Sequence, residues 1–149
     1  ESCHAYIART RKRNDGIMGD FVKYYDGSFS EPGNFGKETP VIENAWHTKF
    51  AYLKKYNLYI ASSTALNICK KGGPICADYM ELRTSKDLIN WSEPVSFEYD
   101  GKKFGWHYCS LVPRDDKNPI AVIEDDDFII LLNHNGTDSF RHDCSFVRK

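Results

Sequence analysis

The feature that most constrains the fold is the absence of helical periodicity over 149 residues. No stretch keeps apolar residues at i, i+3, i+4 and i+7 for three turns, which is the pattern of an amphipathic helix. Short apolar or alternating runs recur instead, and Gly, Pro, Asn and Asp separate them. They are rich in aromatic residues and return every ~8–12 residues, a spacing typical of β-sandwiches, barrels and propellers. The sequence therefore predicts an all-β chain.

The order of the expected strands favours one of these architectures. Residues 48–99 form a unit of four short strands, KFAYL, NLYIASST, DYMELRTS and PVSFEYD. Residues 107–149 repeat that order loosely, and a four-stranded antiparallel unit repeated every ~40–50 residues is a propeller blade. We expect a single domain, residues 1–149, that is part of a β-propeller, with a β-sandwich or a barrel as the alternative. The approximate blades are 1–45 (partial), 46–105 and 106–149.

The stretch RTSKDLINWSEP, residues 83–94, predicts the outer hairpin of a blade. Side chains of Ser85 and Asp87 can cap backbone amides in such a turn. We expect Leu88 to pack inward beneath the turn and Trp91 to fill the gap between neighbouring blades. An ordinary hairpin with a surface tryptophan is the alternative.

Four stretches resemble segments of the five-bladed β-propeller glycoside hydrolases, the arabinanase/xylosidase-like and fructosidase-like group, and their order along the chain adds to the resemblance. In chain order they are YNLYIAS (residues 56–62), SKDLINWSEP (85–94), WHYCSLV (106–112) and DDFIILLNH (126–134). The resemblance covers most of residues 38–134. It implies a carbohydrate-active protein, either a glycosidase that hydrolyses oligo- or polysaccharides with paired carboxylates or a non-catalytic carbohydrate- or protein-binding module.

The resemblance also implies candidate site residues. In that family a Glu in a Glu-Gly-Pro segment protonates the leaving group, and the matching stretch here is GKETP, residues 36–40. Glu38 is therefore the candidate general acid, and Glu31 in SEPG is its rival. Glycosidases commonly use two carboxyl groups, one of them kept protonated by an apolar pocket. The candidates for binding substrate are Trp46, His47, Trp106 and His107.

Each of these assignments has a structural alternative. Glu38 would be a surface loop acid, the tryptophans would pack between blades, and the histidines would be satisfied core residues.

The chain is short for the fold that it resembles. A five-bladed propeller needs roughly 200–250 residues, and this length suffices for about three blades. An open arc leaves apolar blade faces bare. We therefore expect another chain, or a missing N-terminal portion, to complete the propeller and to supply the general base.

The five cysteines leave the cellular compartment open. Cys69 and Cys76 flank a Gly-Gly-Pro turn and predict a local disulfide. Cys109 and Cys144 lie in strand-like contexts and predict a second disulfide across a sheet. Cys3 would then find its partner outside the chain. Five reduced thiols in a cytosolic protein are the alternative.

Two N-glycosylation sequons, which begin at Asn90 and Asn135, favour a secreted or extracellular glycoprotein. Neither a Gly-x-Ser-x-Gly elbow nor a phosphate-binding Gly-x-x-x-x-Gly-Lys loop is present. The sequence therefore does not predict a serine triad or a nucleotide site.

The charges are balanced, with 20 basic and 21 acidic residues. This balance predicts no nucleic-acid partner, and no apolar run approaches the ~18 residues of a membrane span. The basic run Arg9, Arg11, Lys12 and Arg13 predicts a solvated edge, with a binding patch as the alternative. The acidic run Glu124–Asp127 predicts a turn between strands. Calcium is its alternative, although the run lacks the spacing of an EF-hand loop, and we expect no metal site and no other cofactor.

Overall fold

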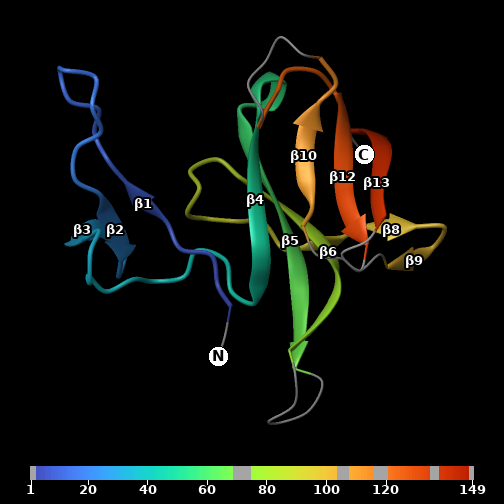
Figure 1. Cartoon of the computed structure of the whole chain (residues 1–149), viewed down its shortest axis with the longest axis horizontal. Helices are drawn as coiled ribbons and strands as arrows, with labels where there is room; N and C mark the ends of the chain where they lie inside the picture. The colour runs from blue at the N-terminus through green and yellow to red at the C-terminus, as the bar shows by residue number, and fades with distance from the viewer. Residues whose placement is uncertain (1–2, 69–74, 104–107, 116–120, 135–137, 148–149) are drawn as a thin grey trace.

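The computed structural model describes residues 3–68, 75–103, 108–115, 121–134 and 138–147. Over these residues the chain is all-β, with curled sheets that include a half-barrel. Figure 1 shows an N-terminal lobe, drawn in blue, beside a larger body that holds the remaining strands. The prediction of an all-β chain is therefore confirmed.

The body contains a five-stranded sheet in the order β11-β4-β5-β6-β7. Neighbours from β4 to β7 are antiparallel, whereas β11 runs parallel to β4. The four strands expected between residues 48 and 99 are thus present and in the expected order. The strands are β4 (Ala45–Leu53), β5 (Leu58–Ile68), β6 (Ile75–Ser85), β7 (Val95–Ser96) and β11 (Val122–Ile123), with the 3-10 turn η1 (Lys54–Tyr56) between β4 and β5.

A second, three-stranded antiparallel sheet has the order β10-β12-β13 and lies beside the first in Figure 1. Its strands are β10 (Ser110–Pro113), β12 (Asp127–His134) and β13 (Asp138–Ser145). A short hairpin of β8 (Glu98–Tyr99) and β9 (Lys102–Lys103) precedes it. The strands β10, β12 and β13 lie where strands were expected after residue 107, whereas β11, expected in the same unit, pairs with β4 of the first sheet.

The main hydrophobic core contains side chains from both sheets. Successive side chains of a strand point to opposite faces, so each sheet has one face that can be buried. Ile60, Met80 and Ile130 are at most 1% exposed, whereas Leu131 beside Ile130 is 43% exposed. The other buried members are Ala51, Leu53, Cys109, Leu111, Ile123, Phe128 and Leu132.

The N-terminal lobe is a three-stranded antiparallel sheet of β1 (Ala8–Arg9), β2 (Val22–Tyr25) and β3 (Ser28–Pro32). The turn expected at residues 14–16 is present. The third strand was not predicted, because SFSEP has only weak apolar alternation. Its pairing follows from the Asp26-Gly27 turn, where both residues have positive φ, as type I′ hairpin turns require.

A small apolar cluster joins the lobe to the body. Its buried members are Ala5, Ile42, Ala45 and Ala61, and Trp91 packs against it. The Trp91 indole N–H donates to the carbonyl of Leu88 at 3.1 Å, which orients the ring. The tryptophan therefore packs between the main sheet and the N-terminal segment.

The turn after β6 has the side-chain caps that its sequence predicts. Ser85 Oγ accepts hydrogen bonds from the amides of Asp87 and Leu88, at 3.2 and 2.9 Å. Asp87 Oδ1 accepts from the amides of Ile89 and Asn90, at 2.9 and 2.7 Å. The backbone and side-chain amides of Asn90, together with the Ile89 amide, hold the pKa of Asp87 well below its usual range.

Asp87→Asn should lower the unfolding midpoint more near neutral pH than at about pH 3, where part of the stabilisation is already lost. A lowered pKa means that the Asp87 carboxylate stabilises the fold above its unfolded pKa of about 3.9, and that this stabilisation is lost as the pH falls toward the folded value. Urea unfolding of both proteins at about pH 7 and about pH 3 measures the difference, with exposed Lys86→Gln as the control. An equal loss at both pH values would contradict this account.

Candidate functional site

A bulge near the start of β4 places the first candidate residues. The register between β4 and β5 shifts between Trp46 and Lys49, and His47 has a φ of 50°. A bulge re-aims the side chain that it carries. A non-glycine residue in the left-handed region costs on the order of 1–3 kcal/mol, and such strain concentrates at functional sites.

At the bulge, the His47 ring stacks with two other aromatic rings. The His47 ring lies 4.2 Å from the Trp46 ring and 4.4 Å from the Tyr108 ring, centroid to centroid, with interplanar angles of 21° and 24°. Tyr108 also has a positive φ, 60°, and is 57% exposed. We call Trp46, His47 and Tyr108 the ring stack. Its two strained backbones and exposed outer ring make it the best-formed candidate binding surface.

Polar groups lie close to the ring stack. Trp46 pairs in register with Thr64 of β5, which is 2% exposed. Thr48, next to His47, has a buried hydroxyl that forms no hydrogen bond with any described residue. A buried hydroxyl without a partner costs about 1–3 kcal/mol, which a polar ligand or water can offset.

The thiols of the second sheet are packing groups. Burial raises the pKa of Cys109 to about 12, so its thiol stays neutral. Burial also raises the pKa of Cys144. Cys3, Cys109 and Cys144 are all free, so the predicted Cys109–Cys144 disulfide is wrong. The cause is the strand order: β12 lies between β10 and β13, which separates their chains by about 9–10 Å, beyond disulfide reach.

The predicted acids lie on the N-terminal lobe, around Lys23 of β2. The Lys23 ammonium forms an ion pair with Glu38 at 2.8 Å and donates to the Gly36 carbonyl at 3.2 Å. Glu31 pairs in register with Lys23, and its carboxylate accepts the amide of Lys37 at 3.1 Å. The structure thus brings Glu31 and Glu38 to one lysine, on a different sheet from Trp46 and His47.

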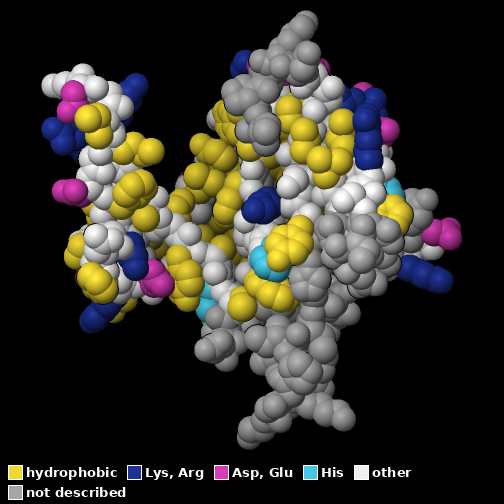
Figure 2. Space-filling model, viewed as in Figure 1, with side chains coloured by type: hydrophobic (Ala, Val, Ile, Leu, Met, Phe, Trp, Pro, Cys, Tyr) yellow, Lys and Arg dark blue, Asp and Glu magenta, His cyan; other side chains and the backbone are white. Residues whose placement is uncertain are grey.

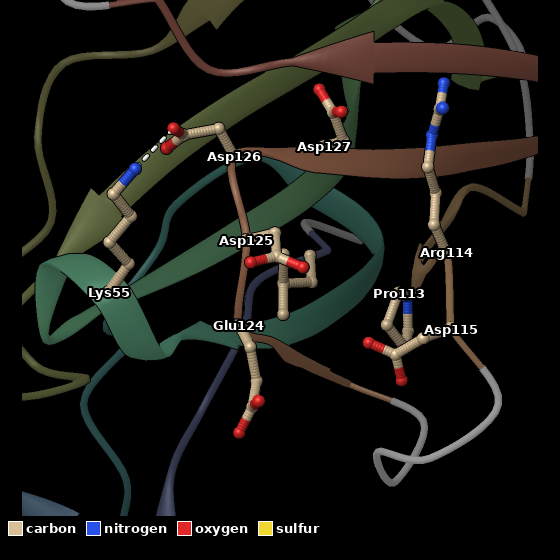
Figure 3. Close-up of a pocket in the computed structure, with 9 residues that line it drawn as sticks. Lys55, Pro113, Arg114, Asp115, Glu124, Asp125, Asp126 and Asp127 are labelled. Carbon is tan, nitrogen blue, oxygen red and sulfur yellow. Dashed lines mark hydrogen bonds and ion pairs between the residues drawn. The ribbon is translucent and has the colours of Figure 1, made fainter.

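The acidic run lines a cavity of about 440 Å³ together with Lys55, Pro113, Arg114, Asp115 and Ile123. Lys55 pairs with Asp126 across it (Figure 3). Lys54 pairs with Glu124, and the hydroxyl of Tyr56 donates to Asp126. Hydrogen bonds to these carboxylates raise the pKa of both lysines, which therefore stay charged.

These contacts hold η1 against the segment between β11 and β12. The acidic run Glu124–Asp127 therefore connects two strands, which confirms the turn predicted there. Among the described residues, no group of His, Cys, Asp or Glu side chains is arranged to hold a metal ion.

A buried ion pair on β6 was not predicted. Arg83 Nη1 lies 2.9 Å from Glu81 Oε2, and Glu81 is 8% exposed. The available signal was local: opposite charges two residues apart on a strand share one face.

Several predictions fall on residues that the structure does not describe. Trp106, His107, Cys69 and Asn135 lie outside the described residues, and the Cys76 side chain is not described. Asn90 is exposed, as a glycan acceptor must be, and its side-chain amide donates to Asp87 at 2.7 Å. Tyr108, which follows His107 directly, is the ring that the sequence reasoning missed.

Comparison with known proteins identifies no family. No protein-family model matches the chain, and neither a curated protein nor a solved structure matches it significantly. In the part of the chain that the structure describes, no helix has the length and apolarity needed to cross a membrane.

Proposed function

We propose that this chain binds carbohydrate on the ring stack. The observation that carries the proposal is the stack itself, whose rings lie 4.2 and 4.4 Å apart and whose outer ring is 57% exposed. Aromatic rings offer a large, rigid apolar surface at low entropic cost, which suits the apolar C–H face of a sugar. The Thr48 hydroxyl, next to His47, forms no hydrogen bond with any described residue and supports the proposal as a polar group that a sugar hydroxyl or a bridging water can satisfy.

Tyr108→Ala should weaken binding of neutral oligosaccharides about tenfold or more, as loss of a central aromatic contact commonly does. A glycan array of the whole chain selects the sugar, and calorimetric titration measures its dissociation constant. Tyr6→Ala is the matched control, because Tyr6 is 43% exposed but lies on the N-terminal segment. Equal affinity of the Tyr108→Ala protein and the unaltered chain would exclude the ring stack.

The same proposal treats the β4–β7 meander as one blade of a β-propeller that another chain or further sequence completes. Large apolar side chains on the N-terminal lobe support it: Ile17, Met18, Phe21 and Phe35 are between 48% and 106% exposed. Figure 2 shows hydrophobic side chains on this lobe. Exposed patches of this kind mark interaction surfaces. In this proposal the protein is secreted, and exposed Asn90 carries a glycan.

Glycoside hydrolysis is the second candidate, supported by the presence of two carboxyl groups, Glu31 and Glu38, on one side of the N-terminal lobe near Lys23. In this reading Glu38 is the general acid of a completed assembly. Glu38→Gln should lower its hydrolysis rate by at least about 10²-fold, the usual contribution of a general acid, with little change in substrate binding. Glu43→Gln, an exposed acid just before β4, is the control. An unchanged rate for Glu38→Gln would remove Glu38 from the mechanism.

A further inference from the structure

The outer end of the N-terminal lobe carries a concave basic surface. A hollow of about 470 Å³ is lined by Arg9, Thr10, Arg11, Lys12 and Arg13 from one chain segment, and by Gly19, Asp20, Val22 and Phe29 opposite. Lys and Arg side chains appear in dark blue at the upper end of the lobe in Figure 2. We call this hollow the basic groove. The sequence alone favoured a solvated edge here over a binding patch.

The walls of the basic groove are held in place. The Arg9 guanidinium carbon lies 4.1 Å from the centroid of the Phe29 ring, a cation–π contact, and Tyr24 packs edge-on against Phe29 at 5.4 Å. The Thr10 hydroxyl donates to the Gly19 carbonyl at 2.7 Å. A Cβ at Gly19 would lie 3.1 Å from the Arg11 carbonyl oxygen, so glycine permits this close approach. The Arg9 side chain and the backbone that carries the other cations are therefore held in place by these contacts.

Most of this positive charge is not neutralised within the lobe. Arg13 pairs with Asp15 at 3.1 Å. Across the described ranges, no carboxylate lies within ion-pair distance of Arg9, Arg11 or Lys12. Asp20 is the one acid that lines the groove. Guanidinium and ammonium groups placed in this way bind carboxylates and sulfates through charge-assisted hydrogen bonds.

The dimensions of the groove favour a polymer over a single ion. An extended segment rises about 3.3 Å per residue, so residues 9 to 13 span about 13 Å. A row of that length fits several repeated anionic groups. Nucleic acid fits less well, because Arg9 covers one face of Phe29, the aromatic ring among the described lining residues, and Tyr24 packs against the same ring.

We infer that the basic groove binds an acidic polysaccharide, one that carries repeated carboxylate or sulfate groups. The inference deepens the proposed function and rests on it, because it adds an anionic class of glycan to a carbohydrate-binding chain. The ring stack would contact sugar faces, and the basic groove would contact the charged substituents.

Calorimetric titration of the whole chain tests the inference with polygalacturonate, heparin, neutral arabinan and single-stranded DNA. Arg11→Gln/Lys12→Gln should bind the acidic polysaccharides about tenfold more weakly, since two charge-assisted contacts are lost, and should leave arabinan binding unchanged. Lys86→Gln/Lys102→Gln removes the same charge at exposed positions elsewhere and should have no effect. Stronger binding of polygalacturonate or of heparin identifies the preferred anionic group.

Three results would overturn the inference: equal loss in both double variants, no loss in either, or DNA bound as tightly as the polysaccharides. Failure of the proposed function looks different. In that case arabinan does not bind, while the acidic polysaccharides bind in a manner that depends on Arg11 and Lys12. Circular dichroism melting curves of each variant confirm that its fold is intact.

Discussion

Ile130→Ala should lower the free energy of unfolding by about 2–5 kcal/mol, one of the two largest losses expected for this chain. Ile130 is 0% exposed in β12 and belongs to the main core with Ile60 and Met80. Truncation removes buried methyl groups and leaves a cavity, because a closely packed interior relaxes only in part. Urea unfolding at neutral pH measures the loss as a shift in the midpoint.

The neighbouring residue provides a matched control. Leu131 lies in the same strand but is 43% exposed, so Leu131→Ala should change the free energy of unfolding by less than about 1 kcal/mol. The pair tests the alternation of β12 directly. Equal losses for the two variants would mean that β12 is buried on both faces, or that its register differs by one residue.

The parts of the fold that the sequence predicted depend on local interactions. Strand identity follows from alternation, and the β4–β5–β6–β7 order follows from short connections between neighbours in the chain. The turn at Ser85 and Asp87 was predicted for the same reason, since its caps join residues at most three positions apart. Local chemistry of this kind needs no knowledge of the tertiary structure.

The parts that were missed depend on contacts between distant segments. The parallel pairing of β11 with β4 joins Val122 to Tyr52, and nothing in either segment indicates the other. The ring stack requires the bulge at His47 and a left-handed backbone conformation at Tyr108. The residue types around these two positions indicate neither feature. The Cys109–Cys144 disulfide was predicted because both residues were assigned to strands, but the intervening strand β12 was not considered.

Arg83→Met should destabilise the protein by about 3–5 kcal/mol, the usual result of leaving a buried charge without its partner. The Arg83 and Glu81 side chains are only 14% and 10% exposed, and Arg83 Nη1 lies 2.9 Å from Glu81 Oε2. Ser63 of β5, opposite Glu81 in register, provides a hydroxyl 3.4 Å from Arg83 Nη1. Methionine keeps the apolar stem of the arginine, so the expected loss comes from charge and not from volume.

The double variant Glu81→Leu/Arg83→Met separates the two causes. It removes both charges and keeps apolar volume, so it should be more stable than Arg83→Met alone, because replacing a whole buried pair by apolar residues is often neutral or stabilising. Urea unfolding of the two single variants and the double variant gives the coupling energy between the positions. If the two single losses simply add, the ion pair does not stabilise this face of β6, and the cost of Arg83→Met arises from packing around its stem.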